Sequence, residues 1–237
     1  MSLLTIIQQA APILGIAKPA AVIGSSDLQV QQLLEIAQEE GHELAKRHDW
    51  RQMTKAGEFQ AVDDFEQPGS LPGDYDRMAQ GATMWNSTQR WPIAGPVTPE
   101  QWADLQGRPV VPTVQAFFRI IGTAFWLYPA PAASDVITFE YQSRIWCRPA
   151  AGGPPQTEWE ADTDLGILDE RLMKLGVIWR WKRAKGFDYA EELSTYERNV
   201  EREAARINGR IVISMARHNR RSDAWPRVNV PANIPGA

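Results

Sequence analysis

The distribution of helical periodicity sets the strongest limit on how this chain of 237 residues folds. Apolar residues recur every three or four positions near both ends, but not in the long stretch 51–159. That middle stretch holds most of the 17 prolines, and its apolar residues alternate as they do in strands. Helices must bury their apolar faces against other elements. We therefore expect the helices of the two ends to pack together around a β-rich insertion.

The N-terminal part of the chain predicts two helices. Residues 26–48 have one continuous apolar face, and Ser26 and Gln29 have the spacing of a capping box. Residues 3–11 predict a shorter helix, which Pro12 ends or kinks.

The C-terminal part predicts two more helices within residues 160–208. The first starts near 162, with Asp162 and Asp164 as favourable charges at its N-terminus, and ends at Gly186. Asp188 caps the second helix. Because the turn between them is short, we expect an antiparallel helical hairpin.

The middle stretch predicts short strands joined by turns. The strand candidates are 53–60, 117–121, 124–128 and 136–145. Gly122 and Thr123 have the position of a tight hairpin turn. A long loop, 67–115, contains one predicted helical turn at 98–105, where Pro99 suits a helix start.

These elements predict an α+β fold with three parts. A helical bundle is formed by residues 1–50 and 160–208, and a small β-rich module, 51–159, is inserted into it. Residues 209–237 show no sustained pattern and are expected to form an extended C-terminal arm.

The arm differs from the rest of the chain in charge. It carries five arginines and one aspartate, which leaves 20 basic against 28 acidic residues elsewhere. An acidic body repels phosphates and is unsuited to gripping DNA. We expect the arm to order on a partner or a neighbouring subunit, with an apolar anchor and a basic group. The anchor is Ile211, Val212, Ile213 and Met215, and the basic group is Arg217, Arg220 and Arg221.

The ten tryptophans indicate contact surfaces as well as core. Trp126, at the centre of a predicted hairpin strand, is interpreted as core. Trp85, Trp91 and Trp102 fall in the predicted long loop, where one chain would struggle to bury them all. We therefore predict that these three contribute to an interface, with core packing as the alternative for any one of them.

The sequence contains no constellation that predicts an enzyme. The three histidines lack metal-ligand spacing, and no phosphate-binding loop or nucleophile motif is present, so no metal or cofactor is expected. The single cysteine, Cys147, excludes an intrachain disulfide and fits a reducing cytosol. The N-terminus makes a poor signal peptide, and no apolar stretch has the length of a membrane span.

Two other function classes stay open. A carbohydrate-binding or hydrolysing module would need tryptophans exposed in a groove beside Asp74 or Asp76. The simpler interpretation of these acids is that they are solvated loop residues. A DNA-binding regulator would need a basic helix face, whereas 188–203 carries six acids.

Three segments together resemble a known family. They are LPGDYDRM at 71–78, FRIIGTAFWLYPAP at 118–131 and TFEYQS at 138–143, with a tryptophan-bearing loop after the first. In this order, between helices from both ends, they resemble the head-to-tail adaptor proteins of short-tailed bacteriophages, the tail tubular protein A family. The resemblance covers about residues 20–208.

The resemblance implies a structural protein of the virion neck or tail, made in the host cytoplasm. Such adaptors form a ring, a dodecamer, between the portal protein and the tail nozzle protein, and DNA passes through the channel without specific binding. On this basis the arm is expected to dock on the portal or a neighbouring subunit. The three interface tryptophans are expected to meet a neighbouring subunit or the nozzle. No membrane contact is implied.

Overall fold

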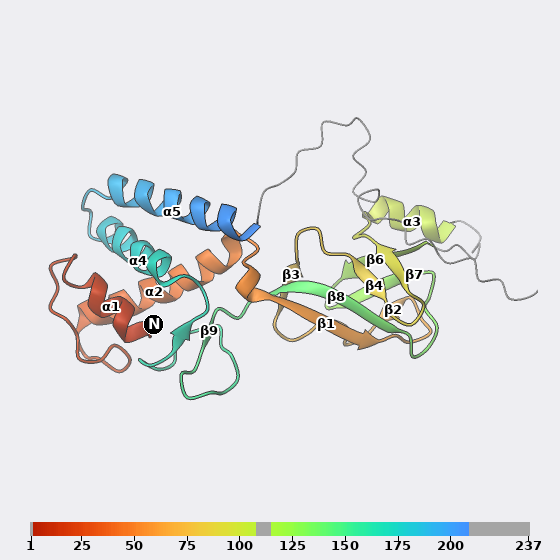
Figure 1. Ribbon diagram of the computed structural model, residues 1–237, viewed down its shortest axis with the longest axis horizontal. Coiled ribbons are helices and arrows are strands. Elements are labelled where there is room, and N and C mark those ends of the chain that lie inside the picture. Colours follow the sequence, from red (N-terminus) through yellow and green to blue (C-terminus); the bar gives the residue numbers. More distant parts are fainter. Residues whose placement is uncertain (1, 108–114, 209–237) are drawn as a thin grey trace, which may run out of the picture.

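The computed structural model describes residues 2–107 and 115–208 and divides them into two lobes (Figure 1). The helical lobe holds α1 (Leu3–Ala10), α2 (Leu28–Arg47), α4 (Glu170–Ala184) and α5 (Ala190–Asn208). The β-lobe holds the large sheet and α3 (Pro99–Gly107). The described chain is therefore α+β, with five α-helices and a curled sheet.

Side-chain caps determine where the first two helices begin. Ser2 accepts a hydrogen bond from the backbone of Thr5 at the start of α1. The long helix expected over 26–48 is present as α2, but Ser26 is not its cap. Asp27 is the cap, because its carboxylate accepts a hydrogen bond from the backbone of Gln29 at 2.8 Å.

Helix α4 begins later than the sequence pattern predicts. Its cap is Asp169, so the prediction of a helix from residue 162 is wrong. Asp162 instead accepts hydrogen bonds from the backbone of Val22 and Ile23, and Asp164 from that of Glu160 and Ala161. These acids are therefore loop anchors and not charges at a helix terminus.

The turn that follows α4 agrees with the prediction. Gly186 ends the helix with φ of 75°, a conformation that glycine adopts without strain. Asp188 then accepts a hydrogen bond from the backbone of Ala190 at the start of α5.

Helix α4 lies at the centre of the helical lobe, where it contacts α1, α2 and α5. Three residues that follow β8 in the chain complete this core, namely Trp146, Cys147 and Trp159. The Trp146 ring lies edge-on to Trp159, with 5.1 Å between centroids. It also lies against α2 at Gly41, where a Cβ atom would fall 2.4 Å from the ring. No helix in the described part of the chain has the length and apolarity that crossing a membrane requires.

The β-lobe is built on one mostly antiparallel sheet. Its strands are β1 (Thr54–Gln60), β2 (Glu66–Gln67), β3 (Tyr75–Met78), β4 (Met84–Asn86), β5 (Trp91–Ala94), β6 (Ala116–Ile121), β7 (Ala124–Tyr128) and β8 (Val136–Ser143). The order is β1-β8-β4-β5-β6-β7-β2, with β3 also paired to β8 and only β5–β6 parallel. Two further strands, β9 (Cys147–Arg148) and β10 (Leu165–Gly166), pair with each other.

The four predicted strands are confirmed as β1, β6, β7 and β8, and the turn at Gly122 is confirmed between β6 and β7. The predicted long loop over 67–115 is wrong in part, because β3, β4 and β5 lie within it. These strands have three or four residues each, too few for an alternating pattern to stand out. The predicted helical turn is present as α3. There, Thr98 and Gln101 exchange side-chain to backbone hydrogen bonds.

Both faces of the hairpin β6–β7 are covered by other parts of the β-lobe. Phe125 and Leu127 face the main core of the β-lobe and are almost fully buried. Trp126 and Tyr128, on the other face of β7, contact Trp102 of α3 edge-on, with centroids 6.4 and 6.2 Å away. Trp126 is half-buried, so the prediction that it belongs to the main core is wrong. Alternation along the strand places it under α3.

The two lobes have separate hydrophobic cores. The cluster in the helical lobe and the cluster around Phe125 and Phe139 share no residue. The chain enters the β-lobe after α2, through Trp50 and Met53, and leaves it after β8. Polar contacts, described below, connect the lobes at the first crossing and hold the end of β8 at the second.

Candidate functional site

The residues predicted to bind a partner lie outside the described part of the chain. Ile211, Val212, Ile213, Met215, Arg217, Arg220 and Arg221 all belong to 209–237. Their assignment stays a prediction. The described residue closest to them in sequence is Asn208, at the end of α5 beside the crossing between the lobes (Figure 1).

The three tryptophans predicted to form an interface do not share one surface. Trp85 and Trp91 lie in the β4–β5 hairpin, but neighbouring pairs in the register place them on opposite faces. Trp85 is 38% exposed and Trp91 is half-buried. Trp102 is buried against Trp126 and Tyr128 of its own chain. Trp85 is thus the most accessible of the three to a partner.

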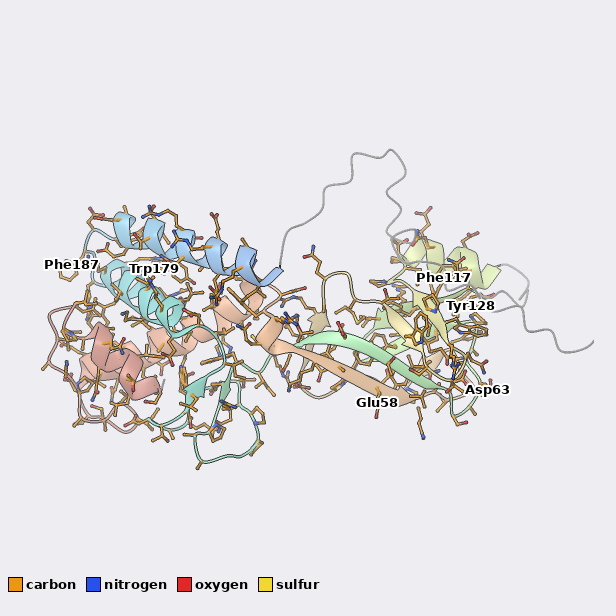
Figure 2. The ribbon with its side chains drawn as sticks, viewed as in Figure 1. Glu58, Asp63, Phe117, Tyr128, Trp179 and Phe187 are labelled. Carbon is orange, nitrogen blue, oxygen red and sulfur yellow. The ribbon has the colours of Figure 1, made fainter. Side chains whose placement is uncertain are left out.

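Large exposed apolar side chains occur on both lobes. In the described residues they are Ile13, Leu28 and Phe187 on the helical lobe, and Val62, Trp85 and Ile121 on the β-lobe. Figure 2 places Phe187 at the end of the helical lobe farthest from the β-lobe, and Asp63, which follows Val62, at the opposite end of the molecule. Apolar contact surface is therefore available at both ends of the elongated chain.

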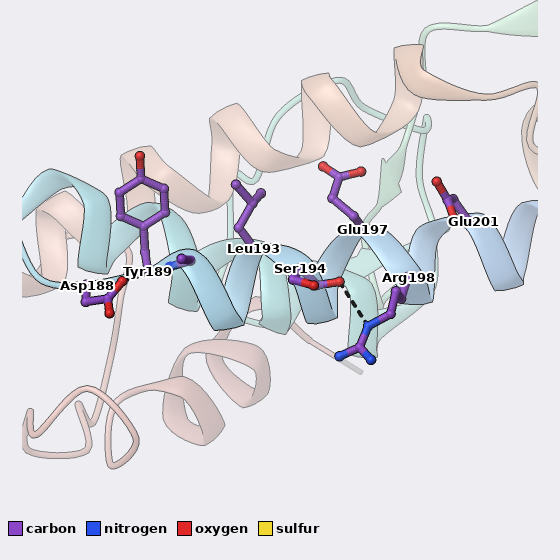
Figure 3. A pocket seen from close by; sticks show the side chains of 8 residues that line it. Asp188, Tyr189, Leu193, Ser194, Glu197, Arg198 and Glu201 are labelled. Atoms are coloured by element: carbon purple, nitrogen blue, oxygen red, sulfur yellow. Dashed lines mark hydrogen bonds between the residues drawn. The ribbon is translucent and has the colours of Figure 1, made fainter.

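A shallow groove of about 730 Å³ runs along α5 (Figure 3). Tyr189, Leu193, Glu197 and Glu201 line one side, and Arg198 lies on the other, where its guanidinium donates to the backbone oxygen of Ser194 at 3.3 Å. The residues that line this groove come from one helix and the turn before it. A depression of this kind suits contact with another protein better than it suits catalysis.

A second groove, of about 560 Å³, lies between the start of α2 and the end of α4, and we call it the distal groove. Its apolar lining is Leu28, Leu34, Ile36, Trp181 and Ala184. Glu35 and Lys185 stand on its polar rim. Leu28, the most exposed large apolar residue of the described chain, is 66% exposed.

An ion-pair network joins the lobes where α2 ends. Arg77 of β3 donates from Nε to Asp49 at 2.9 Å and from Nη2 to the backbone oxygen of His48 at 3.0 Å. The second Asp49 oxygen accepts from the backbone of Gln80 at 2.6 Å. Arg77 also pairs with Asp76. The end of α2 is thereby fixed to β3.

A second network surrounds Asp74, beside the strand that returns to the helical lobe. Its carboxylate accepts hydrogen bonds from Lys55 at 2.6 Å, and from Tyr141 and Ser143 at 2.8 Å each. Burial would raise the pKa of Asp74, but these hydrogen bonds outweigh it and hold the pKa below its usual value. Burial and the neighbouring Asp74 charge raise the pKa of Tyr141.

This environment argues against a catalytic acid at Asp74. A glycosidase acid needs a raised pKa so that it is protonated when it meets the substrate. Asp74 is instead held as an anion between two strands, and Asp76 pairs with Arg77. The interpretation of the two acids as solvated loop residues holds in part: Asp74 lies in a turn but is half-buried and hydrogen-bonded, whereas Asp76 is exposed but lies in β3 and pairs with Arg77.

The helical lobe contains a buried charge. Glu40 of α2 is fully buried and accepts hydrogen bonds from Arg180 of α4 at 2.7 Å and from Tyr196 of α5 at 2.6 Å. Burial raises the pKa of Glu40, and the bonds from Tyr196 and Arg180 oppose this. Gly176 provides the space, since a Cβ atom there would fall 2.1 Å from the carboxyl carbon of Glu40. Three helices are thus joined at one carboxylate.

The thiol and imidazole groups are in structural settings. Burial and nearby acids raise the pKa of Cys147 to about 12, and its thiol donates to the backbone oxygen of Glu158 at 2.9 Å. A thiol so protonated is a poor nucleophile. His42 and His48 lie edge-on to tryptophans. Among residues 2–107 and 115–208, no group of three or more His, Cys, Asp or Glu is placed to hold a metal ion.

Sequence reasoning missed Glu40, Arg180 and the networks at the crossings. Glu40 falls inside the apolar stripe of 26–48, and that position was the available signal, because a charge there must be paired when buried. Arg77 and Asp49 had no such signal, since only the packing of the lobes brings them together.

A family model described as "SU10 adaptor protein" matches residues 1–231. No curated protein matches the chain. The family match spans both lobes and extends into the residues after α5.

Proposed function

The chain belongs to the SU10 adaptor protein family, a family of phage head-to-tail adaptors, and on this basis we propose that it forms the ring that joins the portal to the tail nozzle around the DNA channel. As a member of this family it is a structural component of the virion. The observation that best supports the connecting role is the placement of exposed apolar side chains at both ends of a two-lobed chain. A connector needs two separate contact ends.

The ring consists of identical copies arranged head to tail. A heterologous contact that closes on itself produces a ring, and twelve copies is the number that the adaptor resemblance implies. We propose that residues 1–50 with 160–208 and residues 51–159 act as two domains, each facing a different part of the neck. Their separate hydrophobic cores support this division. The chain is synthesised in the host cytoplasm and joins the virion during assembly.

DNA passes through the ring without sequence-specific binding. The body of the chain is acidic, and a surface of this sign lets a polyanion slide rather than gripping it. Asp188, before α5, and Glu191, in its first turn, are exposed, and Glu192 pairs with Lys182.

The carbohydrate-binding alternative gains no support from the described residues. Trp102 is buried, Trp85 and Trp91 lie on opposite faces of a hairpin, and Asp74 is committed to three hydrogen bonds. No groove described above brings an exposed tryptophan beside an acid of the β-lobe.

The test of the proposed function is assembly with purified portal rings. Co-sedimentation should place the chain in the portal fraction, and negative-stain images should show an added ring on one face of the portal. A compact dimer that does not bind portal rings would contradict the proposal. Loss of a host polysaccharide on incubation with the chain would favour the alternative.

A further inference from the structure

The distal groove combines apolar surface, exposure and a defined position in the fold. Leu28 occupies the first position of α2, and Trp181 and Ala184 come from the last turn of α4. Lys182 of α4 pairs with Glu192 in the first turn of α5, so the end of α4 lies beside the start of α5. The distal groove is therefore at the end of the helical lobe opposite Asn208.

The arm contains a segment whose composition fits this groove. Ile211, Val212, Ile213 and Met215 form its apolar part, and Arg217 follows two residues later. Glu35 lines the groove, and Glu39 lies one turn further along α2 with its side chain 63% exposed. Apolar residues followed by arginines thus match an apolar groove whose α2 side continues into carboxylates, although Glu39 also pairs with Arg180 and Lys185, on the α4 side of the rim, donates to Gln32.

Too few residues separate the segment from the end of α5 for it to reach the distal groove of its own chain. Helix α5 has 19 residues and spans about 28 Å at about 1.5 Å per residue. Ile213 follows Asn208 by five residues, which reach at most about 18 Å when fully extended. An apolar segment at this position meets the distal groove only on another copy.

We infer that residues 211–215 of one copy bind the distal groove of the next copy, with Arg217, Arg220 and Arg221 beside Glu35 and Glu39. This contact is heterologous, since groove and segment are different surfaces, and it repeats from copy to copy. The inference rests on the proposed ring, and it assigns the apolar part of the arm to a neighbouring subunit rather than to the portal.

A mixing experiment with two full-length variants tests this contact without the portal. The groove variant is Leu28→Asp, which keeps α2 intact because an acidic residue is favourable in the first turn of a helix. The segment variant is Ile211→Asp with Ile213→Asp. Gln29→Asp is the matched control, because it adds the same charge one residue away and does not line the groove. Association is measured by sedimentation velocity over a range of concentrations.

The unchanged chain and the Gln29→Asp control should associate as concentration rises, and each test variant alone should stay monomeric. Their mixture should form a one-to-one heterodimer, because one variant keeps the segment and the other keeps the groove. We expect the mixture to associate at least tenfold more tightly than either variant alone. A monomeric mixture, or an unchanged chain that never associates, would overturn the inference. Portal co-sedimentation is read separately, so failure of the ring proposal and failure of this contact are distinguishable.

Discussion

The two lobes bury their cores in different ways. The helical lobe holds a charged cluster, in which Glu40 is bonded to Arg180 and Tyr196 at the meeting point of three helices. The core of the β-lobe is dominated by aromatic rings, with Phe125 within 6.4 Å, centroid to centroid, of Phe59, Tyr75, Phe118 and Phe139. The helical lobe thus adds charge pairing to an apolar core, whereas the β-lobe core depends on shape and apolar area.

Both lobes use glycine where a large group approaches the backbone. Gly176 makes room for Glu40, and Gly57 of β1 makes room for the Phe139 ring, whose nearest atom would lie 2.6 Å from an added Cβ. The lobes therefore differ in the chemistry of the side chain that packs against the glycine, a carboxylate in the helical lobe and an aromatic ring in the β-lobe. Because the two cores share no residue, we expect damage to one lobe to leave the other folded.

Removal of the buried charge should have the largest effect. Glu40→Ala leaves the Nε of half-buried Arg180 and the hydroxyl of buried Tyr196 without their shared acceptor, and it should lower the free energy of unfolding by about 4 kcal/mol. Glu39→Ala is the matched control, because Glu39 pairs with the same arginine but is largely exposed, and it should cost less than about 1 kcal/mol. Urea unfolding measures both values. Equal losses would mean that burial of Glu40 is not the source of its effect.

Loss of the Trp102 ring, which joins α3 to β7, should be nearly as costly. The effect should be confined to the β-lobe. Trp102→Ala removes the contacts with Trp126 and Tyr128 and should cost about 3 kcal/mol. Hydrogen exchange should accelerate in α3 and β7 and stay unchanged in α4. Trp85→Ala, at an exposed position, should change stability by no more than about 0.5 kcal/mol. Faster exchange throughout the helical lobe would contradict the separation of the cores.

A single methyl group should disturb the charged cluster. Gly176→Ala places a Cβ against Glu40 and should cost about 2 kcal/mol. Since the clash needs the carboxylate, the cost of Gly176→Ala should shrink when Glu40 is already alanine. Measurement of both single variants and the double variant gives this coupling. Additive costs would place the strain elsewhere in α4.

Acid should reveal the smallest effect, in the β-lobe beside the end of β8. The pKa of Asp74 is lower in the folded chain than its usual value of 3.8. The folded state therefore binds this proton less tightly than the unfolded state, and the resulting stability is present above pH 3.8 and lost as the pH falls through the folded pKa. The free energy of unfolding of the unchanged chain should exceed that of Asp74→Asn at about pH 6, and this difference should shrink in acid. A difference that is constant with pH would show that Asp74 contributes no linked proton.

The sequence predicts the regular parts of this fold well, because long periodic segments carry their own signal. The α2 stripe and the β6–β7 hairpin with its turn at Gly122 were readable from spacing alone. The start of α4 was not, because Asp162 and Asp164 have the composition of a helix start and yet bond to loops brought near by folding. The short strands β3 and β4 pair with β8, and β5 pairs with β6 as well as with β4, so no local window contains all the partners that define them.

The candidate surfaces were less predictable than the elements. The tryptophan prediction treated Trp85, Trp91 and Trp102 as one group, whereas strand alternation and α3 place them in three environments. The exposure of Leu28 had no signal in the sequence, because a single apolar residue at a helix start does not show which face it takes. Which face a residue takes depends on contacts between lobes and helices that lie far apart in the sequence.

Cryo-electron microscopy of the chain bound to purified portal rings tests the connecting role most directly. The proposed function predicts a closed ring of copies on the portal, with one end of each chain on the portal and the other end free for the nozzle. Density for a neighbour's chain is expected in the distal groove beside Leu28. Single chains scattered on the portal, or a ring in which both lobes of each copy contact the portal, would contradict the account.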